Sequence, residues 1–181
     1  MMNRRRLGSK DIHLDANSLR VLWLADAGGS NFPQFVPVTR GFNDSTSAQI
    51  EGIAGSGGLE GPRLPDGADA YGMALMMTPS GYTGTLTVTP VIRHTAGVSG
   101  DIRMASTYQT WDNGPSFTLG TETTIALADA NEEKALTDIS INIAIDTDPT
   151  WIVLGMYRDG NDVLDTFGNY INAEGFIVSY G

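Results

Sequence analysis

The chain has 181 residues, no cysteine, 41% hydrophobic residues and a formal net charge of −10. This length favours one ordinary domain, with or without an extension, and the hydrophobic fraction is sufficient for a core. The absence of cysteine excludes disulfides, thiolate metal sites and thiol catalysis. No window has the roughly 18 consecutive apolar residues of a membrane span, so we expect no membrane partner.

The charge is distributed unevenly along the chain. Residues 1–10 contain Arg4, Arg5, Arg6 and Lys10 and no acid, whereas residues 11–181 contain 7 basic and 21 acidic side chains. Because an acidic surface repels a phosphate backbone, the body of the protein is not expected to bind nucleic acid. The basic tip can contact an acidic protein surface or packaged nucleic acid, and a solvated terminus explains it equally well.

The first third of the chain, residues 1–68, has only short apolar runs between Gly, Ser, Asn, Asp and Pro. Leu19–Leu24 predicts one short strand. Prolines interrupt the apolar residues 32–38, which indicates an extended segment rather than a central strand. A cap at residues 43–46 predicts a short helix to about Ile53.

A loop-like stretch of this length cannot bury much apolar surface by itself. We therefore expect residues 1–68 to form an extended N-terminal arm and linker that lies against another chain, and residues 1–60 to be removable without unfolding the body. The arm carries large apolar and basic side chains that are suited to anchoring it on another chain. These expected anchors are Arg4, Arg5, Arg6, Trp23, Phe32 and Phe35.

Residues 69–181 contain repeated strand patterns separated by turn sequences. In two of them apolar and polar residues alternate, with isoleucines on one face of 139–146 and threonines on one face of 85–92. The segment 151–158 is apolar on both faces, as in a strand near the centre of a sandwich. The predicted strands are 71–78, 85–92, 101–111, 123–128, 139–146, 151–158 and 176–180. Short strands at this spacing, with no alternating helices, predict an all-β fold: a jelly-roll-like antiparallel β-sandwich over 69–181.

Several of these segments also carry a resemblance to a known family. The motifs are Tyr71–Leu75, Gly84–Val88, Gly100–Met104, Leu154–Asp162 and Gly175–Tyr180. In this order they resemble the jelly-roll domain of tailed-bacteriophage virion proteins of the fibre-head, decoration and cement type. The resemblance covers about 110 residues and does not extend to residues 1–68. It implies assembly into trimers or capsomer-associated clusters, and no catalysis.

The C-terminal motif has two interpretations. Arg158 and Asp165 flank one tight connection, so they can form a bidentate ion pair that fixes the last strands, with the Thr166 hydroxyl bound to a nearby backbone group. The connection also offers oxygen ligands for calcium from Asp159, Asn161, Asp162 and Asp165. Its spacing lacks the bidentate glutamate of a twelve-residue calcium loop, so we favour the ion pair and expect no metal and no cofactor.

Nothing in the sequence forms a convincing catalytic set. Glu132 and Glu133 are adjacent carboxylates in a polar connection, and His94 lies near hydroxyls without a nucleophile elbow. We therefore expect a protein that is not an enzyme.

Aromatic residues can instead form a platform that stacks on a sugar. Trp111 is followed by Asp112 and Asn113 at a loop edge, where a ligand can reach it, but we favour a place in the core or in a subunit interface. Tyr82 and Tyr108 are further candidates, and Trp151 is expected in the core.

Together these observations predict a structural component of a tailed-phage virion, located in the particle as a decoration, cement, tail or fibre-associated subunit. Its expected partners are copies of itself, as a homotrimer, and other capsid or tail proteins. The alternative is a carbohydrate- or receptor-binding module of a phage fibre, because fold alone does not separate the two.

Overall fold

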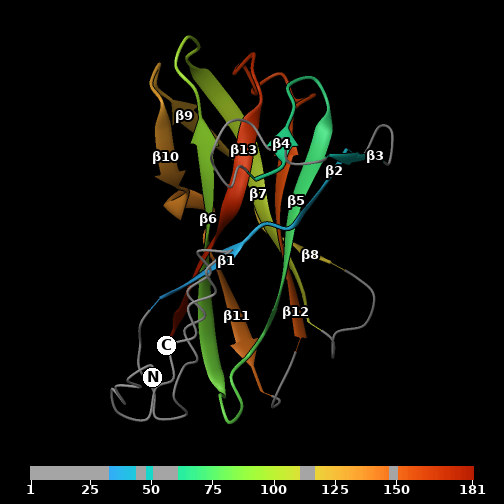
Figure 1. Ribbon diagram of the computed structural model, residues 1–181, viewed down its shortest axis with the longest axis vertical. Coiled ribbons are helices and arrows are strands. Elements are labelled where there is room, and N and C mark those ends of the chain that lie inside the picture. Colours follow the sequence, from blue (N-terminus) through green and yellow to red (C-terminus); the bar gives the residue numbers. More distant parts are fainter. Residues whose placement is uncertain (1–32, 44–47, 51–60, 111–116, 147–150) are drawn as a thin grey trace, which may run out of the picture.

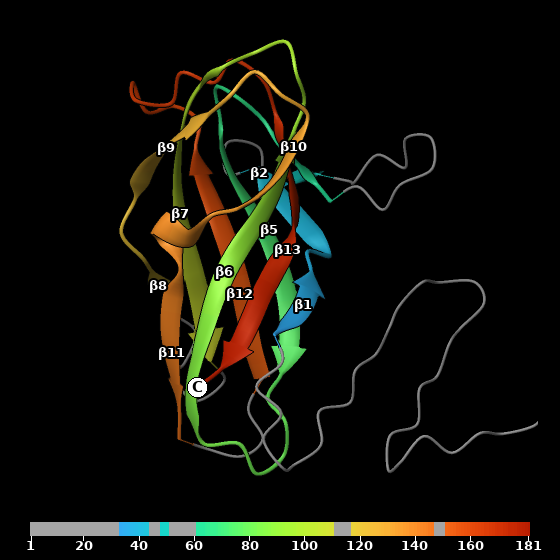
Figure 2. The same cartoon turned by 90° about the vertical axis from the view of Figure 1, so that its left-hand side faces the viewer.

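The computed structural model describes residues 33–43, 48–50, 61–110, 117–146 and 151–181. In this part of the chain two antiparallel sheets pack face to face (Figures 1 and 2), which confirms the predicted all-β sandwich. The only helical element among the described residues is the short 3-10 turn η2 (Thr137–Ile139). Within the same residues no helix has the length and hydropathy of a membrane span.

We name each sheet after its central strand. The β6 sheet contains β1 (Gln34–Pro37), β4 (Arg63–Leu64), β6 (Gly84–His94), β10 (Glu132–Ala135), β11 (Ile141–Ile145) and β13 (Ile171–Tyr180). The β12 sheet contains β2 (Arg40–Asn43), β3 (Ala48–Ile50), β5 (Asp69–Met77), β7 (Gly100–Thr110), β8 (Thr118–Leu119), β9 (Thr123–Leu127) and β12 (Trp151–Asp159).

Alternation along the strands determines which side chains enter the core. In β11 the side chains of Ile143 and Ile145 are buried, whereas Asn142 and Ala144 face solvent. In β6 the side chains of Leu86 and Val88 are fully buried, and Thr85 and Thr87, which alternate with them, lie on the outer face. The apolar faces that the sequence predicts for these two strands therefore lie in the core between the sheets.

The central strand of the second sheet is β12, which pairs with β5 on one side and with β7 on the other. This agrees with the prediction from its apolar sequence. Trp151, at the start of this strand, is 48% exposed, so its expected place in the core is wrong. The inner face is formed by Ile152, Leu154 and Met156, and Trp151 has the opposite parity.

Part of the segment assigned to the arm belongs to the sandwich. Strand β1 pairs with β13, β2 pairs with β5, and β4 pairs with β13. The side chains of Val36, Val38 and Leu64 lie in the core of their own chain. The described parts of 33–68 are therefore not an arm, and residues 1–32 lie outside the described residues.

Two further local predictions are corrected. The helix expected up to about Ile53 is replaced over residues 48–50 by strand β3, which pairs with β2. The polar connection expected around Glu132 and Glu133 is strand β10, which pairs with the end of β6. The charged side chains of β10 lie at the rim of the sheet, where an alternating apolar pattern is not required.

Candidate functional site

Arg158 is the most extensively bonded side chain in the described structure. Its Nε and Nη2 donate to Oδ2 and Oδ1 of Asp165 at 2.9 and 2.7 Å. Nη1 donates to the carbonyl oxygens of Leu64 and Asn169, and Nη2 also donates to that of Phe167. All five N–H groups of the guanidinium are thus used, so Arg158 has none left for a ligand.

The ion pair predicted from the sequence is present and fully buried, with both side chains 0% exposed. Asp165 Oδ2 also accepts the backbone N–H of Arg103, and the Thr166 hydroxyl accepts that of Asp101, as expected. The network connects β4 of one sheet to β7 and β12 of the other. Its role is to hold the C-terminal connection on the sandwich.

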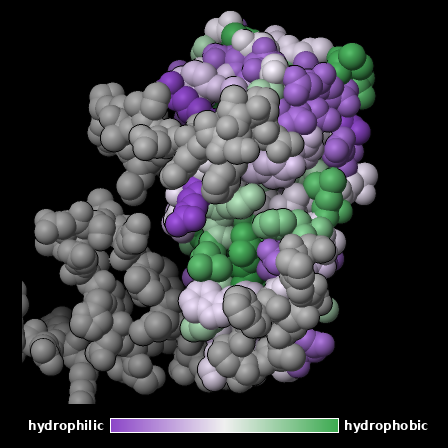
Figure 3. Space-filling model, turned by 90° about the vertical axis from the view of Figure 1, so that its right-hand side faces the viewer, coloured by the Kyte–Doolittle hydropathy of each residue, from purple (hydrophilic) through white to green (hydrophobic). Residues whose placement is uncertain are grey.

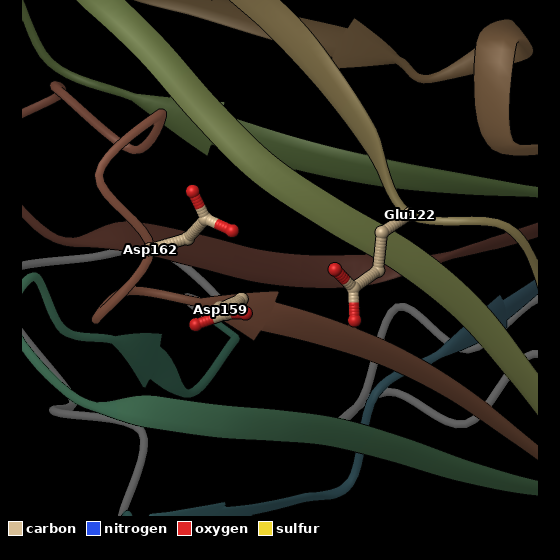
Figure 4. Close-up of side chains that lie close together, drawn as sticks. All are labelled: Glu122, Asp159 and Asp162. Carbon is tan, nitrogen blue, oxygen red and sulfur yellow. The ribbon is translucent and has the colours of Figure 1, made fainter.

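A cluster of three carboxylates lies close to this network (Figure 4). Ligand atoms of Glu122, Asp159 and Asp162 lie within 4.8 Å of one another. The cluster contains two of the four residues considered for a calcium loop. Of the other two, Asp165 is bound to Arg158, and Asn161 donates to Asp69 at 3.1 Å.

The cluster already has a cation beside it, and one of its carboxyls has a raised pKa. Arg103 Nε lies 3.4 Å from Glu122 and 4.0 Å from Asp162. Burial, followed by a hydrogen bond to Asp69 and the nearby acids, raises the pKa of Asp159, which favours its protonated form. With one ligand oxygen from each carboxylate, the cluster supplies three of the 6–8 oxygens that calcium takes. We assign no metal to this cluster.

His94 is unsuited to act as a base on a solvent-borne substrate. Its ring is 1% exposed and lies edge-on to Phe167, with ring centroids 5.8 Å apart. Its Nε2 lies 3.6 Å from Glu132 Oε2. His94 therefore belongs to the packing between the sheets.

The outer face of the β12 sheet carries an exposed apolar surface. Its members come from the end of β5, the start of β12, and β8 with the residue before it, and each is about half exposed. They are Leu75 (57%), Met77 (49%), Phe117 (46%), Leu119 (53%) and Trp151 (48%), which we call the apolar face. Figure 3 looks onto this side of the molecule and shows hydrophobic surface gathered across its middle.

Strand register explains why these side chains gather. Met77 lies opposite Trp151, and Leu75 lies opposite Val153, so they share the face that points away from the core. Leu119 lies opposite Thr107 on the neighbouring β7. The charged residues of the same outer face, such as Asp69, Arg103 and Asp159, lie at the other end of the strands. The apolar face itself contains no charged side chain.

A groove of about 460 Å³ lies beside the apolar face, between the two sheets. One wall comes from Thr118, Gly120 and Thr121 around β8, and the other from η2 and the start of β11. Tyr108, one of the aromatic residues considered for sugar stacking, lies in this groove. The other aromatic candidate, Tyr82, packs edge-on against Tyr180 with centroids 5.2 Å apart.

Several predicted site residues lie outside the described residues: Arg4, Arg5, Arg6, Trp23, Phe32, Trp111, Asp112 and Asn113. Phe35 is described, and it lies in β1 rather than in an arm. Its ring covers Gly175 of β13, where an added Cβ would approach the ring within 2.5 Å. Since 51% of Phe35 remains exposed, its role as an anchor stays a prediction.

The sequence did not reveal the apolar face or the acidic cluster. The apolar residues resemble core residues when strand parity is unknown, and Glu122 is far from Asp159 in sequence. Comparison with known proteins gives no further assignment, because no family model matches the chain and no curated protein matches it.

Proposed function

We propose that this protein is a non-enzymatic structural subunit of a tailed-phage virion, and that it assembles with copies of itself as a homotrimer. The observation that carries the proposal is the apolar face on the outside of the β12 sheet. The virion of a tailed phage is proposed because residues 69–181 resemble the jelly-roll domain of tailed-bacteriophage virion proteins. In this account residues 1–32 attach the trimer to other capsid or tail proteins.

The size of the apolar face supports a protein contact. Its five half-exposed side chains present on the order of 500 Å², towards the upper end of the about 300–600 Å² of the largest patch on a typical monomer. A stable interface needs about 800 Å² from each partner, so the face supplies much of one but not all of it. The remaining area has to come from other segments, such as the N-terminal one.

The charge distribution supports contact between copies at this face. Residues 33–181 contain 6 basic and 18 acidic side chains, so two copies of this body repel each other over most of their surface. The apolar face carries no charge, and burying it removes half-exposed Trp151, Met77 and Leu75 from water. Its burial is worth roughly 25 cal/mol for each Å².

The mass of the assembled protein tests the proposal. We expect native mass spectrometry of the full chain to give three times the 19.3 kDa of one chain. Leu75→Asp introduces a charge on the apolar face without touching the core, and should shift the mass to that of a single chain. Thr85→Asp is the matched control, because it adds the same charge at an exposed position on the outer face of the β6 sheet.

Two results would contradict the proposal. One is a full-length chain that remains monomeric at the highest accessible concentration. The other is an assembly that Leu75→Asp leaves intact, because the copies would then meet elsewhere.

The alternative function, a carbohydrate- or receptor-binding module of a fibre, depends on Trp111, Asp112 and Asn113. A glycan array with the assembled full-length protein tests it separately. Binding that Trp111→Ala abolishes would favour it, and it is compatible with an assembly role.

A further inference from the structure

Strand β11 presents an open edge of the β6 sheet. It pairs with β6 along its whole length, from Ile141 opposite Val88 to Ile145 opposite Gly84. No other described strand pairs with its second edge, and β8 likewise pairs only with β7. The groove is lined by residues of both of these strands, and β8 and β11 lie at the left of Figure 2. Unpaired N–H and C=O groups of an edge strand form a template for another strand.

This edge lacks the features that usually prevent such pairing. Strand β11 has the sequence Ile-Asn-Ile-Ala-Ile, with no charge, no proline and no irregularity in its register. In contrast, β10 lies beside the other half of β6 and carries Glu132, Glu133 and Lys134. Because charged side chains and bulges protect edge strands, β10 is protected and β11 is not.

The groove has room for the side chains of an added strand. Its volume of about 460 Å³ lies between Thr118 and Gly120 on one wall and Ile141 on the other. The backbone N–H of Gly120 donates to the Ser106 carbonyl at 2.8 Å, which fixes the first wall. An extended segment can therefore pair with β11 through its main chain and place alternate side chains in the groove.

A segment of suitable chemistry precedes β1. Residues 19–24, Leu-Arg-Val-Leu-Trp-Leu, are the most apolar run in residues 1–32 and are predicted as a strand. Residues 1–32 contain 5 basic and 3 acidic side chains, so their net charge is opposite to that of the body. Charge complementarity thus favours contact between residues 1–32, which include Arg20 of this segment, and the acidic body of another copy.

The connection before β1 is long enough to extend past its own body. Within one chain Gln34 lies opposite Val178, Val178 opposite Val88, and Val88 opposite Ile141, so β1 begins three strand spacings, about 14 Å, from its own β11. The chain between Leu24 and Gln34 can extend to about 30 Å, which exceeds this distance and leaves length to reach β11 of a copy packed beside it. The groove also adjoins the apolar face, because β8 contributes Leu119 to that face and Thr118 to the groove.

We propose that residues 19–24 of one copy add as a strand to β11 of a neighbouring copy, with alternate side chains in the groove between β8 and β11. This inference rests on the proposed assembly of the protein and names the segment that completes the interface. The apolar face supplies the contact between bodies, and the added strand joins each body to the N-terminal segment of its neighbour.

Engineered disulfides test this arrangement, because the native chain has no cysteine. Cysteine is placed in turn at each of residues 19–24, and each variant is co-expressed with a mass-tagged Ala144→Cys chain. Ala144 is exposed on β11. A disulfide between the two different chains then reports contact between copies, and is measured on non-reducing gels and by mass.

The matched control replaces Ala144→Cys with Thr85→Cys. Thr85 lies opposite Ala144 on the same outer face, but one strand further from the open edge. An added strand would then lie about 10 Å from Thr85, beyond the 4.4–6.8 Å between Cα atoms that a disulfide spans.

We expect one strong crosslink to Ala144→Cys, from the residue of 19–24 that lies directly opposite it, with weaker ones two residues away, none at the residues between, and few to Thr85→Cys, because a strand presents alternate side chains to one face. Equal crosslinking at all six residues, equal crosslinking to both partners, or crosslinks only within one chain would overturn the inference. The native mass of the wild-type protein distinguishes the two levels of failure. A trimer without these crosslinks refutes only the strand addition, whereas a monomer refutes the assembly as well.

Discussion

The two sheets of the sandwich have similar inner faces and different outer faces. The outer face of the β6 sheet presents Thr85, Thr87 and Asn142, and the Thr87 hydroxyl donates to Asn142 Oδ1 at 2.9 Å. The corresponding part of the β12 sheet presents Leu75 and Trp151 with other large apolar side chains. The inner faces of both sheets are apolar because they form the core. The outer face of the β12 sheet is not needed for the core, so its large apolar side chains indicate an interaction with another protein.

The largest expected effect concerns the strands that complete the two sheets from the N-terminal side. Deleting residues 1–32 should leave a cooperative unfolding transition, because every described strand is kept. Deleting residues 1–43 removes β1 and β2, with the buried side chains of Val36 and Val38. We expect a loss of about 3–6 kcal/mol from these two side chains alone. Urea unfolding followed by circular dichroism compares the two truncations.

Equal stability of the two truncations would contradict this placement of β1. It would instead support the expectation from the sequence that residues 1–60 can be removed without unfolding the rest of the protein.

A second effect concerns the network that ties the two sheets together. Asp165→Ala leaves the buried guanidinium of Arg158 without its carboxylate, so we expect a loss of about 3–5 kcal/mol. Asp66→Ala is the matched control, because Asp66 lies 3.8 Å from the same Nη2 but is 44% exposed. Its removal should cost no more than about 1 kcal/mol. The free energies of unfolding follow from urea titrations with unchanged slope.

Similar losses in Asp165→Ala and Asp66→Ala would show that the burial of the pair does not determine its contribution. The network would then not be the main connection at this end of the sandwich.

The smallest effect concerns the charged end of the outer β12 face. The pKa of Asp159 is raised above its ordinary value of 3.8, so the folded state binds this proton more tightly than the unfolded state does. The contribution of Asp159 to stability therefore falls as pH rises through its raised pKa. Asp159→Asn should raise stability at pH 7 by less than about 1 kcal/mol, because the site is partly exposed.

The gain from Asp159→Asn should shrink as pH falls through the raised pKa of Asp159, because the wild-type carboxyl then takes up its proton. Melting temperatures measured across this range check the prediction. Asp146→Asn removes one negative charge at an exposed acid outside the cluster and is the matched control for the change in net charge. A gain in stability from Asp159→Asn that grows as pH falls would contradict a raised pKa of Asp159.

The sequence predicted those parts of the fold in which alternation or local chemistry determines the structure. The isoleucines of β11 alternate with polar residues, and this pattern reports the buried face directly. Arg158 and Asp165 lie on either side of one short connection, so their pairing could be predicted from spacing alone.

The remaining features depend on pairing between segments that are distant in sequence. Strand β1 has only four residues and ends in Pro37, and its place in the sheet is determined by β13. In β12 both faces are apolar, so the sequence does not indicate that Trp151 points outward and Ile152 inward. The apolar face requires the register of β5, β12, β7 and β8, which no local pattern contains.

Oxidative footprinting of the assembled full-length protein tests the central claim most directly, since it reports whether the apolar face is covered. Met77 and Trp151 are about half exposed in a single chain, and Val163 is 89% exposed in a distant loop. We predict that Met77 and Trp151 oxidise several-fold more slowly in the wild-type protein than in Leu75→Asp, while Val163 reacts equally in both. Equal oxidation of Met77 and Trp151 in the two proteins would contradict the account.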